Sequence, residues 1–287
     1  MTVLARTRTE LAAARAALPG RVGMVPTMGA LHAGHVACVD AARAGCDSVV
    51  VSVFVNPMQF DQAADLERYP RTLDADLAIC ERSGVDVVWA PPVEAVYPAG
   101  SPQVWVTAGA IANQLEGPDR PGHFDGMLTV VHKLFSIVRP DAGYFGEKDY
   151  QQLALVRQMV ADLDLGVLVE GVATVREPDG LALSSRNVFL SPDERARALR
   201  LSAALRAGRA AAGTAEAVLA AAGEVLDGVD GADGVDGMNV HYLQLRAPDL
   251  GPAPAAGPAR LLVAATVGAT RLIDNTAVEL TPAGVAR

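Results

Sequence analysis

Short apolar runs and segments of helical spacing alternate through the first half of the chain. Val-rich runs occupy residues 21–26, 47–55 and 85–90, and each is bounded by Gly, Pro or Asn. Such runs are typical of strands that are buried on both faces of a sheet. Two further apolar runs, 142–145 and 167–175, have the same character. The pattern predicts a strand at each of these places.

Between the apolar runs, the spacing of hydrophobic residues predicts helices at residues 33–44, 73–83, 129–138 and 150–163. Strands that alternate with helices form parallel sheets, because each connection crosses back over a face of the sheet. We therefore expect an α/β fold over residues 1–175, a Rossmann-like parallel sheet with helices on both faces.

After Arg176 the pattern changes. Ser191, Pro192 and Asp193 form a helix start, and Ala-rich helical segments follow as far as residue 226. Short apolar runs at 240–245, 260–265 and 270–273 predict three strands. We expect a smaller C-terminal α+β domain over residues 176–287, which would close over a site on the first domain.

A short Gly and Asp repeat, GVDGADGVDG, occupies residues 228–237. A calcium loop of the EF-hand type would need a defined ligand spacing and a terminal Glu. Both are missing, so the repeat predicts a flexible linker.

Composition narrows the function classes. Hydrophobic residues make up 51% of the chain, enough for a substantial core. The net charge of −9 argues against nucleic acid as a partner, since binding a phosphate backbone needs an excess of Lys and Arg. The apolar runs are too short to span a bilayer, and the N-terminus lacks the apolar core of a signal peptide. Cys38, Cys46 and Cys80 have no metal or disulfide spacing and are interpreted as small buried residues. We expect a cytoplasmic protein.

Three unusual polar segments directly follow predicted strands. They are residues 26–35, 56–60 and 146–152. In open parallel sheets, ligands bind at the carboxyl ends of the strands, where loops lead into helices. The sequence therefore places its candidate chemistry at the edge where such a sheet binds ligands.

The first segment contains His32 and His35, three residues apart at the start of a predicted helix. At this spacing two imidazoles share one helix face, and the helix N-terminus offers unpaired N–H groups to an anion. Gly29 permits a tight turn, and Gly34 leaves room beside the helix. Phosphate binding is the favoured interpretation; a zinc pair, which lacks a third ligand here, and histidines without a site remain alternatives.

The segment at residues 146–152 places Lys148 at a strand end, where its compact charge suits a phosphate. Asp149 is either a helix cap or a functional residue, and Gln152 lies one turn into the following helix. A further group, Ser184, Ser185 and Arg186, combines hydroxyls and a guanidinium that suit a polyphosphate, whereas taken alone its default interpretation is a capped loop.

The segment at residues 56–60 contains Gln59, whose uncharged amide both donates and accepts hydrogen bonds. This chemistry fits a hydroxylated organic acid better than a phosphate. A Gly- and Pro-rich stretch at residues 116–124 adds Arg120 and His123, and we expect it to be a loop that closes over substrate.

Five motifs together carry a family resemblance. They are PTMGALHAGH (26–35), FVNPMQF (54–60), YPRT (69–72), GEKDYQQL (146–153) and SSRN (184–187). In this order and spacing, they resemble the pantothenate synthetase (pantoate–β-alanine ligase) family of H-x-G-H nucleotidyltransferases. The resemblance covers residues 22–187 and continues more weakly to the end of the chain.

The resemblance implies a two-step ligase reaction. ATP would adenylate the carboxylate of (R)-pantoate with release of pyrophosphate, and β-alanine would then displace AMP to give pantothenate. Mg²⁺ would accompany ATP, and the enzyme would be a homodimer. We name no protein ligand for the metal: Ala75 stands in a stretch where relatives often carry more carboxylates, and Mg²⁺ is commonly held by ATP oxygens and water.

The resemblance also implies residue roles. His35 would be the catalytic acid, with His32 and Lys148 stabilising charge on the phosphates. Gln59 and Gln152 would bind pantoate, with Gln59 also near β-alanine. Leu183 replaces the family's usual Met, a change of similar volume. The expected ATP contacts are Met28, Gly29, Ala30, Leu31, His32, Ala33, Gly34, His35, Gly146, Glu147, Lys148, Asp149, Val175, Leu183, Ser184, Ser185 and Arg186.

Three rival functions remain. An adenylyltransferase that acts on a phosphorylated acceptor would need further basic residues, which the neutral Gln59 and Gln152 do not supply. A zinc-dependent hydrolase would use His32 and His35 as metal ligands. A regulatory module would bind a nucleotide without catalysis.

Overall fold

The computed structural model describes residues 1–60, 63–211, 213–227 and 237–282. By internal packing the chain forms two compact units. Unit 1 consists of Met1–Glu147 and Gln151–Ala173, and unit 2 of Lys148–Tyr150 and Thr174–Arg287. The division into domains at residues 1–175 and 176–287 stays a prediction.

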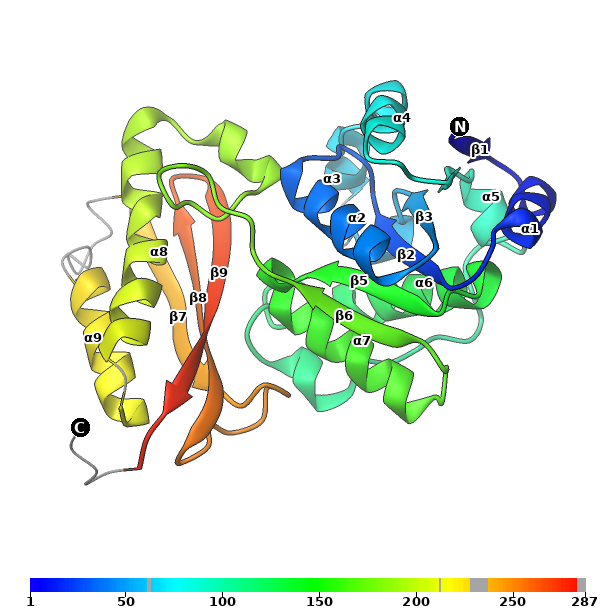
Figure 1. Cartoon of the computed structure of the whole chain (residues 1–287). Helices are drawn as coiled ribbons and strands as arrows, with labels where there is room; N and C mark the ends of the chain where they lie inside the picture. Colours follow the sequence, from blue (N-terminus) through cyan, green and yellow to red (C-terminus); the bar gives the residue numbers. More distant parts are fainter. Residues whose placement is uncertain (61–62, 212, 228–236, 283–287) are drawn as a thin grey trace. The chain divides into compact units, whose positions relative to one another are not determined.

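Unit 1 is built on a six-stranded parallel sheet, as the alternation of strands and helices predicts (Figure 1). The strand order is β1-β4-β3-β2-β5-β6, and β1 is the one strand that the apolar pattern missed. The strands are β1 (Val3–Ala5), β2 (Val22–Thr27), β3 (Ser48–Val53), β4 (Val87–Trp89), β5 (Ala142–Gly146) and β6 (Leu168–Val172).

Helices cover both faces of this sheet, because successive residues of a strand point to opposite sides. On β5, Tyr144 lies against the C-terminal end of α2 (Ala33–Gly45), with its hydroxyl 3.5 Å from the Cys46 Sγ. Phe145 points to the other face and meets Phe135 of α6 (His123–Val138), with ring centroids 6.2 Å apart. The expectation of helices on both faces is confirmed.

The helices predicted at 33–44, 73–83 and 150–163 agree with the structure to within one residue at each end, whereas those at 8–17, 63–68 and 93–96 are not among the predicted ones. One clear difference is α6, which begins at His123, six residues before the predicted start. Gly122 takes the left-handed conformation (φ +74°) that precedes the helix. The others are α1 (Arg8–Ala17), α3 (Ala63–Arg68), α4 (Leu73–Arg82), α5 (Val93–Val96) and α7 (Tyr150–Asp162).

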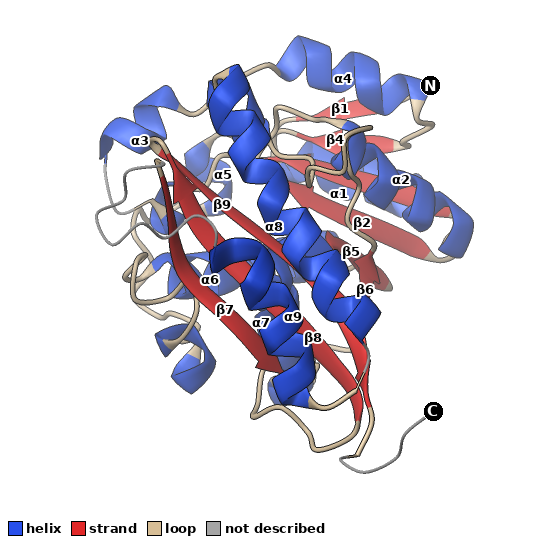
Figure 2. Ribbon diagram, turned by 90° about the vertical axis from the view of Figure 1, so that its left-hand side faces the viewer, coloured by secondary structure: helices blue, strands red, loops and turns tan. Residues whose placement is uncertain are grey.

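Unit 2 packs two helices against a three-stranded antiparallel sheet (Figures 1 and 2). Its elements are α8 (Pro192–Ala211), α9 (Ala215–Asp227), β7 (Met238–Arg246), β8 (Gly257–Val267) and β9 (Thr270–Leu280). The predicted α+β architecture is confirmed, with longer strands than the apolar runs indicated. The predicted linker at 228–237 lies, apart from Gly237, outside the described residues.

The cysteines behave largely as the sequence predicts. All three are free thiols, and burial raises the pKa of Cys38 and of Cys80 to about 11. Cys46 is only half-buried. Within the part of the chain that the structure describes, no helix combines the length and the apolar character that a membrane crossing requires.

Candidate active site

The H-x-G-H segment lies where the direction of strand succession changes in the sheet. From β2 the chain continues outward to β3, whereas β5 pairs with the other edge of β2. Ligands of doubly wound sheets bind at such switch points, beyond the carboxyl ends of the strands. Met28 follows β2, Gln59 follows β3 and Glu147 follows β5, as the sequence predicts.

The turn after β2 is held by side chains and by backbone conformation. The Thr27 hydroxyl donates to the Ser52 carbonyl (2.7 Å) and accepts from the Gly29 N–H (3.1 Å). Gly29 and Ala30 both have positive φ, +87° and +51°. A Cβ at Gly29 would lie 3.0 Å from the Asp76 carboxylate, so both the limited space and the positive φ favour glycine.

The two histidines cap α2 reciprocally. His32 is the N-cap, and its Nδ1 accepts from the Gly34 N–H at 3.1 Å. The His35 Nδ1 accepts from the His32 N–H at 3.3 Å, and the ring centroids are 4.1 Å apart. Since both Nδ1 atoms accept, the proton of each neutral ring lies on Nε2, the atom that can donate to a ligand.

This arrangement corrects one sequence expectation. The helix N-terminus was expected to offer unpaired N–H groups to an anion. The Gly34 N–H is instead taken by His32 Nδ1, and the His35 N–H donates to the His32 carbonyl at 2.8 Å. At these positions an anion would meet imidazole donors and the helix dipole in place of backbone N–H groups.

Gln59 lies beside the first segment. Its Nε2 is 3.0 Å from the Met28 Sδ, so the amide proposed for an organic acid borders the proposed nucleotide segment. Asn56, which is buried, donates from Nδ2 to the Gln59 Oε1 and to the Gly126 carbonyl, both at 3.1 Å. The Tyr97 hydroxyl donates to Asn56 Oδ1 at 2.9 Å, and burial raises the pKa of that phenol.

The N-terminal part of α6 contacts the backbone of the Gln59 segment. The His123 Nδ1 lies 2.9 Å from the Gln59 carbonyl oxygen, and the His123 side chain is buried. Gly126 lies against the backbone of Met58, where an added Cβ would lie 2.0 Å from the Met58 carbonyl oxygen. His123, which the sequence assigned to a closing loop, therefore lies within a helix and holds the backbone of the Gln59 segment.

We predict that Gly126→Ala lowers the free energy of unfolding by about 1–3 kcal/mol, because the new methyl overlaps backbone that cannot move aside cheaply. Gly223→Ala in α9 is the matched control, since nothing lies within 4 Å of its added Cβ. It should stabilise by about 0.5–1 kcal/mol, the usual gain from replacing a helical Gly. Denaturant unfolding followed by circular dichroism measures both, and equal effects of the two substitutions would contradict the prediction.

The stretch at residues 116–124 is anchored at both ends. Gln151, on α7, accepts from the Glu116 N–H (3.0 Å) and donates to the carbonyls of Ile111 and Gln114 (2.9 and 2.8 Å). Only the middle of the stretch is exposed. Its proposed closure over substrate stays a prediction, confined by these anchors to residues 118–122.

In unit 2, residues 175–183 form a short hairpin. The Leu183 N–H donates to the Val175 carbonyl (2.9 Å), so the two residues expected to contact ATP lie directly opposite each other. The following Ser184 caps a 3₁₀ turn (Ser185–Phe189) by accepting from the Arg186 N–H at 3.3 Å. Buried Asn187 ties this turn to the hairpin through the Glu177 carboxylate and the Ala182 carbonyl.

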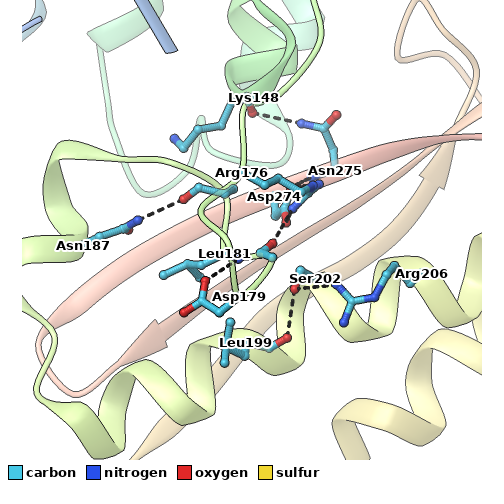
Figure 3. A network of polar contacts seen from close by, with 12 residues as sticks. Lys148, Arg176, Asp179, Leu181, Asn187, Leu199, Ser202, Arg206, Asp274 and Asn275 are labelled. Atoms are coloured by element: carbon cyan, nitrogen blue, oxygen red, sulfur yellow. Dashed lines mark hydrogen bonds and ion pairs between the residues drawn. The ribbon is translucent and has the colours of Figure 1, made fainter. Parts of the chain in front are cut away.

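A pocket in unit 2 gathers Lys148, Ser184 and Arg186 from separate segments of the chain. Arg271 of β9 lines the same pocket and was not identified from the sequence. Asp274, also in its wall, forms an ion pair with Arg176 at 2.6 Å, which offsets its charge (Figure 3). The pocket thus has an excess of positive charge within an acidic protein, as an anion site requires.

The backbone of Lys148 is fixed by β9. Asn275 donates from Nδ2 to the Lys148 carbonyl (2.9 Å) and accepts from Arg260 Nε (2.7 Å). Figure 3 shows the Lys148 side chain directed away from Asn275. Asp149 is largely exposed, 3.8 Å from the Lys148 Nζ, and its role as cap or functional residue stays open.

The remaining expected residues take less central places. Ser185 is exposed, whereas Glu147 and Gln152 are half-buried. Within the described residues, no three His, Cys, Asp or Glu side chains gather to hold a metal ion, and the His32–His35 pair therefore has no such third partner there. The structure adds Asp76, Arg271 and Asn275 around the candidate residues, and it shows what Asn56 and His123, from the segments at 56–60 and 116–124, contact.

Comparisons with known proteins agree with the motifs. The Pantoate-beta-alanine ligase family model matches residues 1–277. A pantothenate synthetase from Salinispora arenicola is 60% identical, with 98% of this chain and 99% of that protein aligned. The crystal structure of pantothenate synthetase from Thermus thermophilus is 48% identical with a TM-score of 0.85, covering 96% of this chain and 98% of that one.

A third relative is described with ligands. The structure of pantoate-beta-alanine ligase from Francisella tularensis, complexed with beta-gamma ATP and beta-alanine, is 35% identical with a TM-score of 0.78. It covers 96% of this chain and 97% of that one. Because family model, sequence relative and solved structures agree over nearly the whole length, the chain belongs to the pantoate–β-alanine ligase (pantothenate synthetase) family.

Proposed function

We propose that this chain condenses (R)-pantoate with β-alanine to form pantothenate, using ATP. Membership of the family supports this activity, and the Francisella tularensis relative is described as complexed with beta-gamma ATP and beta-alanine. The observation that carries the proposal is the contact between Gln59 and Met28. It sets a neutral amide, suited to a hydroxy acid, beside a histidine pair suited to phosphate.

The reaction has two steps. In the first, a pantoate carboxylate oxygen attacks the α-phosphorus of ATP, the bond to the β-phosphate oxygen breaks, and pyrophosphate leaves. In the second, the β-alanine nitrogen attacks the acyl carbon of pantoyl adenylate. The carbon–oxygen bond to phosphate breaks, AMP leaves, and the amine loses one proton as the amide forms.

The residues of this chain would act mainly on phosphate charge. His32 and His35 would donate from Nε2 to oxygens that gain charge in the first step, with His35 as the catalytic acid. Residues 28–35 and 146–149, together with Val175 and Leu183, would contact ATP. Lys148, Ser184, Ser185 and Arg186 would hold the polyphosphate, and Arg271 would add a further positive charge to the same pocket.

Mg²⁺ would accompany ATP and neutralise part of its charge. Phosphate oxygens and water would hold the ion, as is common for Mg²⁺. A homodimer and a cytoplasmic location are also proposed, from the family resemblance alone.

The two neighbouring glutamines of α7 offer a matched test of pantoate binding. Gln152→Ala should raise the KM for pantoate by roughly tenfold, the effect of losing one or two hydrogen bonds to a bound acid. Gln151→Ala removes three hydrogen bonds to residues 111–116 and should mainly lower stability. Steady-state kinetics and thermal unfolding measure the two effects, and an unchanged pantoate KM in Gln152→Ala would contradict the role of that residue.

Exchange of labelled pyrophosphate into ATP tests the function itself. Adenylation predicts exchange that depends on pantoate, and β-alanine should then convert the adenylate to pantothenate and AMP. Exchange that requires a phosphorylated acceptor would favour the rival adenylyltransferase. No exchange with any acid in a panel would refute adenylation.

A further inference from the structure

Asp76 lies in the core of unit 1, directly beneath the H-x-G-H turn. It is 1% exposed, although carboxylates are seldom buried unless they are fully hydrogen-bonded. Its Oδ2 accepts from the Ala30 N–H at 3.1 Å, and its Oδ1 accepts from the Leu31 N–H at 2.8 Å. The Thr72 hydroxyl donates to Oδ2 at 3.3 Å. Each carboxylate oxygen therefore binds the turn.

The turn has the geometry of a backbone anion site. The N–H groups of Ala30 and Leu31 converge on one carboxylate, in a turn where Gly29 and Ala30 have positive φ. Concave arrangements of this kind bind anions in many phosphate sites. Here the anion is supplied by the protein itself, from a helix 46 residues further along the chain.

We propose that Asp76 is a positioning residue, which fixes the turn after β2 so that His32 and His35 present Nε2 to the phosphates of ATP. This inference rests on the proposed function. Because Asp76 occupies the N–H groups of residues 30 and 31, the phosphates are recognised in unit 1 by imidazoles. Asp76 acts through the turn and does not touch substrate.

Two acceptor oxygens on one side chain match the two N–H groups of the turn. Hydrogen bonds from N–H groups to an ionised oxygen are roughly twice as strong as neutral ones. An Asn at this position has nearly the same volume, but one of its two terminal atoms is an NH₂ group. Since that group cannot accept, either the Ala30 or the Leu31 N–H loses its partner, and the left-handed conformation at Ala30 loses a support.

Asp74 provides a matched control. It lies on the same helix in the same acidic stretch, is exposed, and forms no hydrogen bond to the turn. Asp74→Asn removes the same charge as Asp76→Asn without touching residues 30 and 31. A difference between the two variants therefore reports the contact with the turn, and not the loss of a negative charge.

The test combines kinetics with hydrogen exchange. Asp76→Asn should lower kcat/KM for ATP in pyrophosphate exchange by at least roughly tenfold, with the KM for pantoate and for β-alanine unchanged. Amide protection should fall in the peptide that covers residues 28–36 and stay unchanged elsewhere. Asp74→Asn should match the wild type in both measurements.

Two results would overturn the proposal. The first is a wild-type rate of pyrophosphate exchange in Asp76→Asn. The second is a loss of amide protection throughout unit 1 together with a rise in all three KM values, because that combination indicates a general structural role. If Asp76→Asn does not fold, hydrogen exchange in the wild-type protein still tests the contact between Asp76 and the turn. Without ATP, the amides of Ala30 and Leu31 must be protected, and fast exchange there would refute the contact. Absence of pyrophosphate exchange in the wild type would refute the proposed function and leave this amide test intact.

Discussion

Replacing His35 by Asn should lower the rate of pyrophosphate exchange by roughly 10² to 10³, the scale for loss of one charge-stabilising donor. The Asn Oδ1 stands at the position of the imidazole Nδ1 in the side-chain bond sequence. It can therefore still accept from the His32 N–H, the bond that closes the cap of α2. What the variant lacks is Nε2, the proposed phosphate donor.

A set of variants at the same position separates capping from catalysis. His35→Ala removes both functions and should lose stability as well as rate. His35→Gln carries an NH₂ group near the place of Nε2, so it should recover part of the rate while weakening the cap. His241→Asn, on the exposed face of β7, controls for loss of a histidine and should exchange at the wild-type rate. A wild-type rate in folded His35→Asn would refute the role of Nε2.

Replacing Lys148 by Met should also lower turnover by roughly 10² or more, because the pocket loses a positive charge while the apolar stem is retained. The KM for ATP should rise together with this loss. Lys148→Arg keeps the charge but changes its shape, so it should restore only part of the activity. Steady-state kinetics with ATP as the varied substrate measures each effect.

The chain has only two lysines, which makes Lys133 a natural control. Its Nζ lies 5.4 Å from the centroid of the Tyr97 ring, and burial together with the nearby Arg8 lowers its pKa. Lys133→Met should retain turnover. ATP should protect Lys148 from an amine-reactive reagent and leave the labelling of Lys133 unchanged, as peptide mapping can show. Equal labelling of Lys148 with and without ATP would place the nucleotide elsewhere.

Much of the fold and the order of the motifs could be predicted from the sequence. β2, β3 and β5 are short apolar runs, which are typical of buried strands. Their positions therefore follow from a few neighbouring residues. Candidate residues then lie at strand ends because motif and strand are adjacent in the chain. Five motifs in a fixed order also identified the family, a conclusion that the comparisons confirm.

The surroundings of these residues could not be predicted in the same way. Asp76 lies in the stretch around Ala75, where we name no metal ligand, and Asn56 belongs to the 56–60 segment without a role of its own. Arg271 lies in the C-terminal part of the chain, where the family resemblance is weaker, and His123 belonged to a stretch whose Gly and Pro content favoured a loop over the helix that forms. In each case the deciding contact involves chain segments that are far apart in sequence.

The sequence by itself determined the alternation of strands and helices, the family, and which side chains are candidates for phosphate and amide chemistry. Only the tertiary structure decided which backbone groups near those side chains are already hydrogen-bonded. The Ala30 and Leu31 N–H groups are taken by a carboxylate from α4, and the Lys148 carbonyl by an amide 127 residues away. Local periodicity sets secondary structure through short-range geometry, whereas buried polar groups are paired by whichever partner the packed chain brings within hydrogen-bond distance.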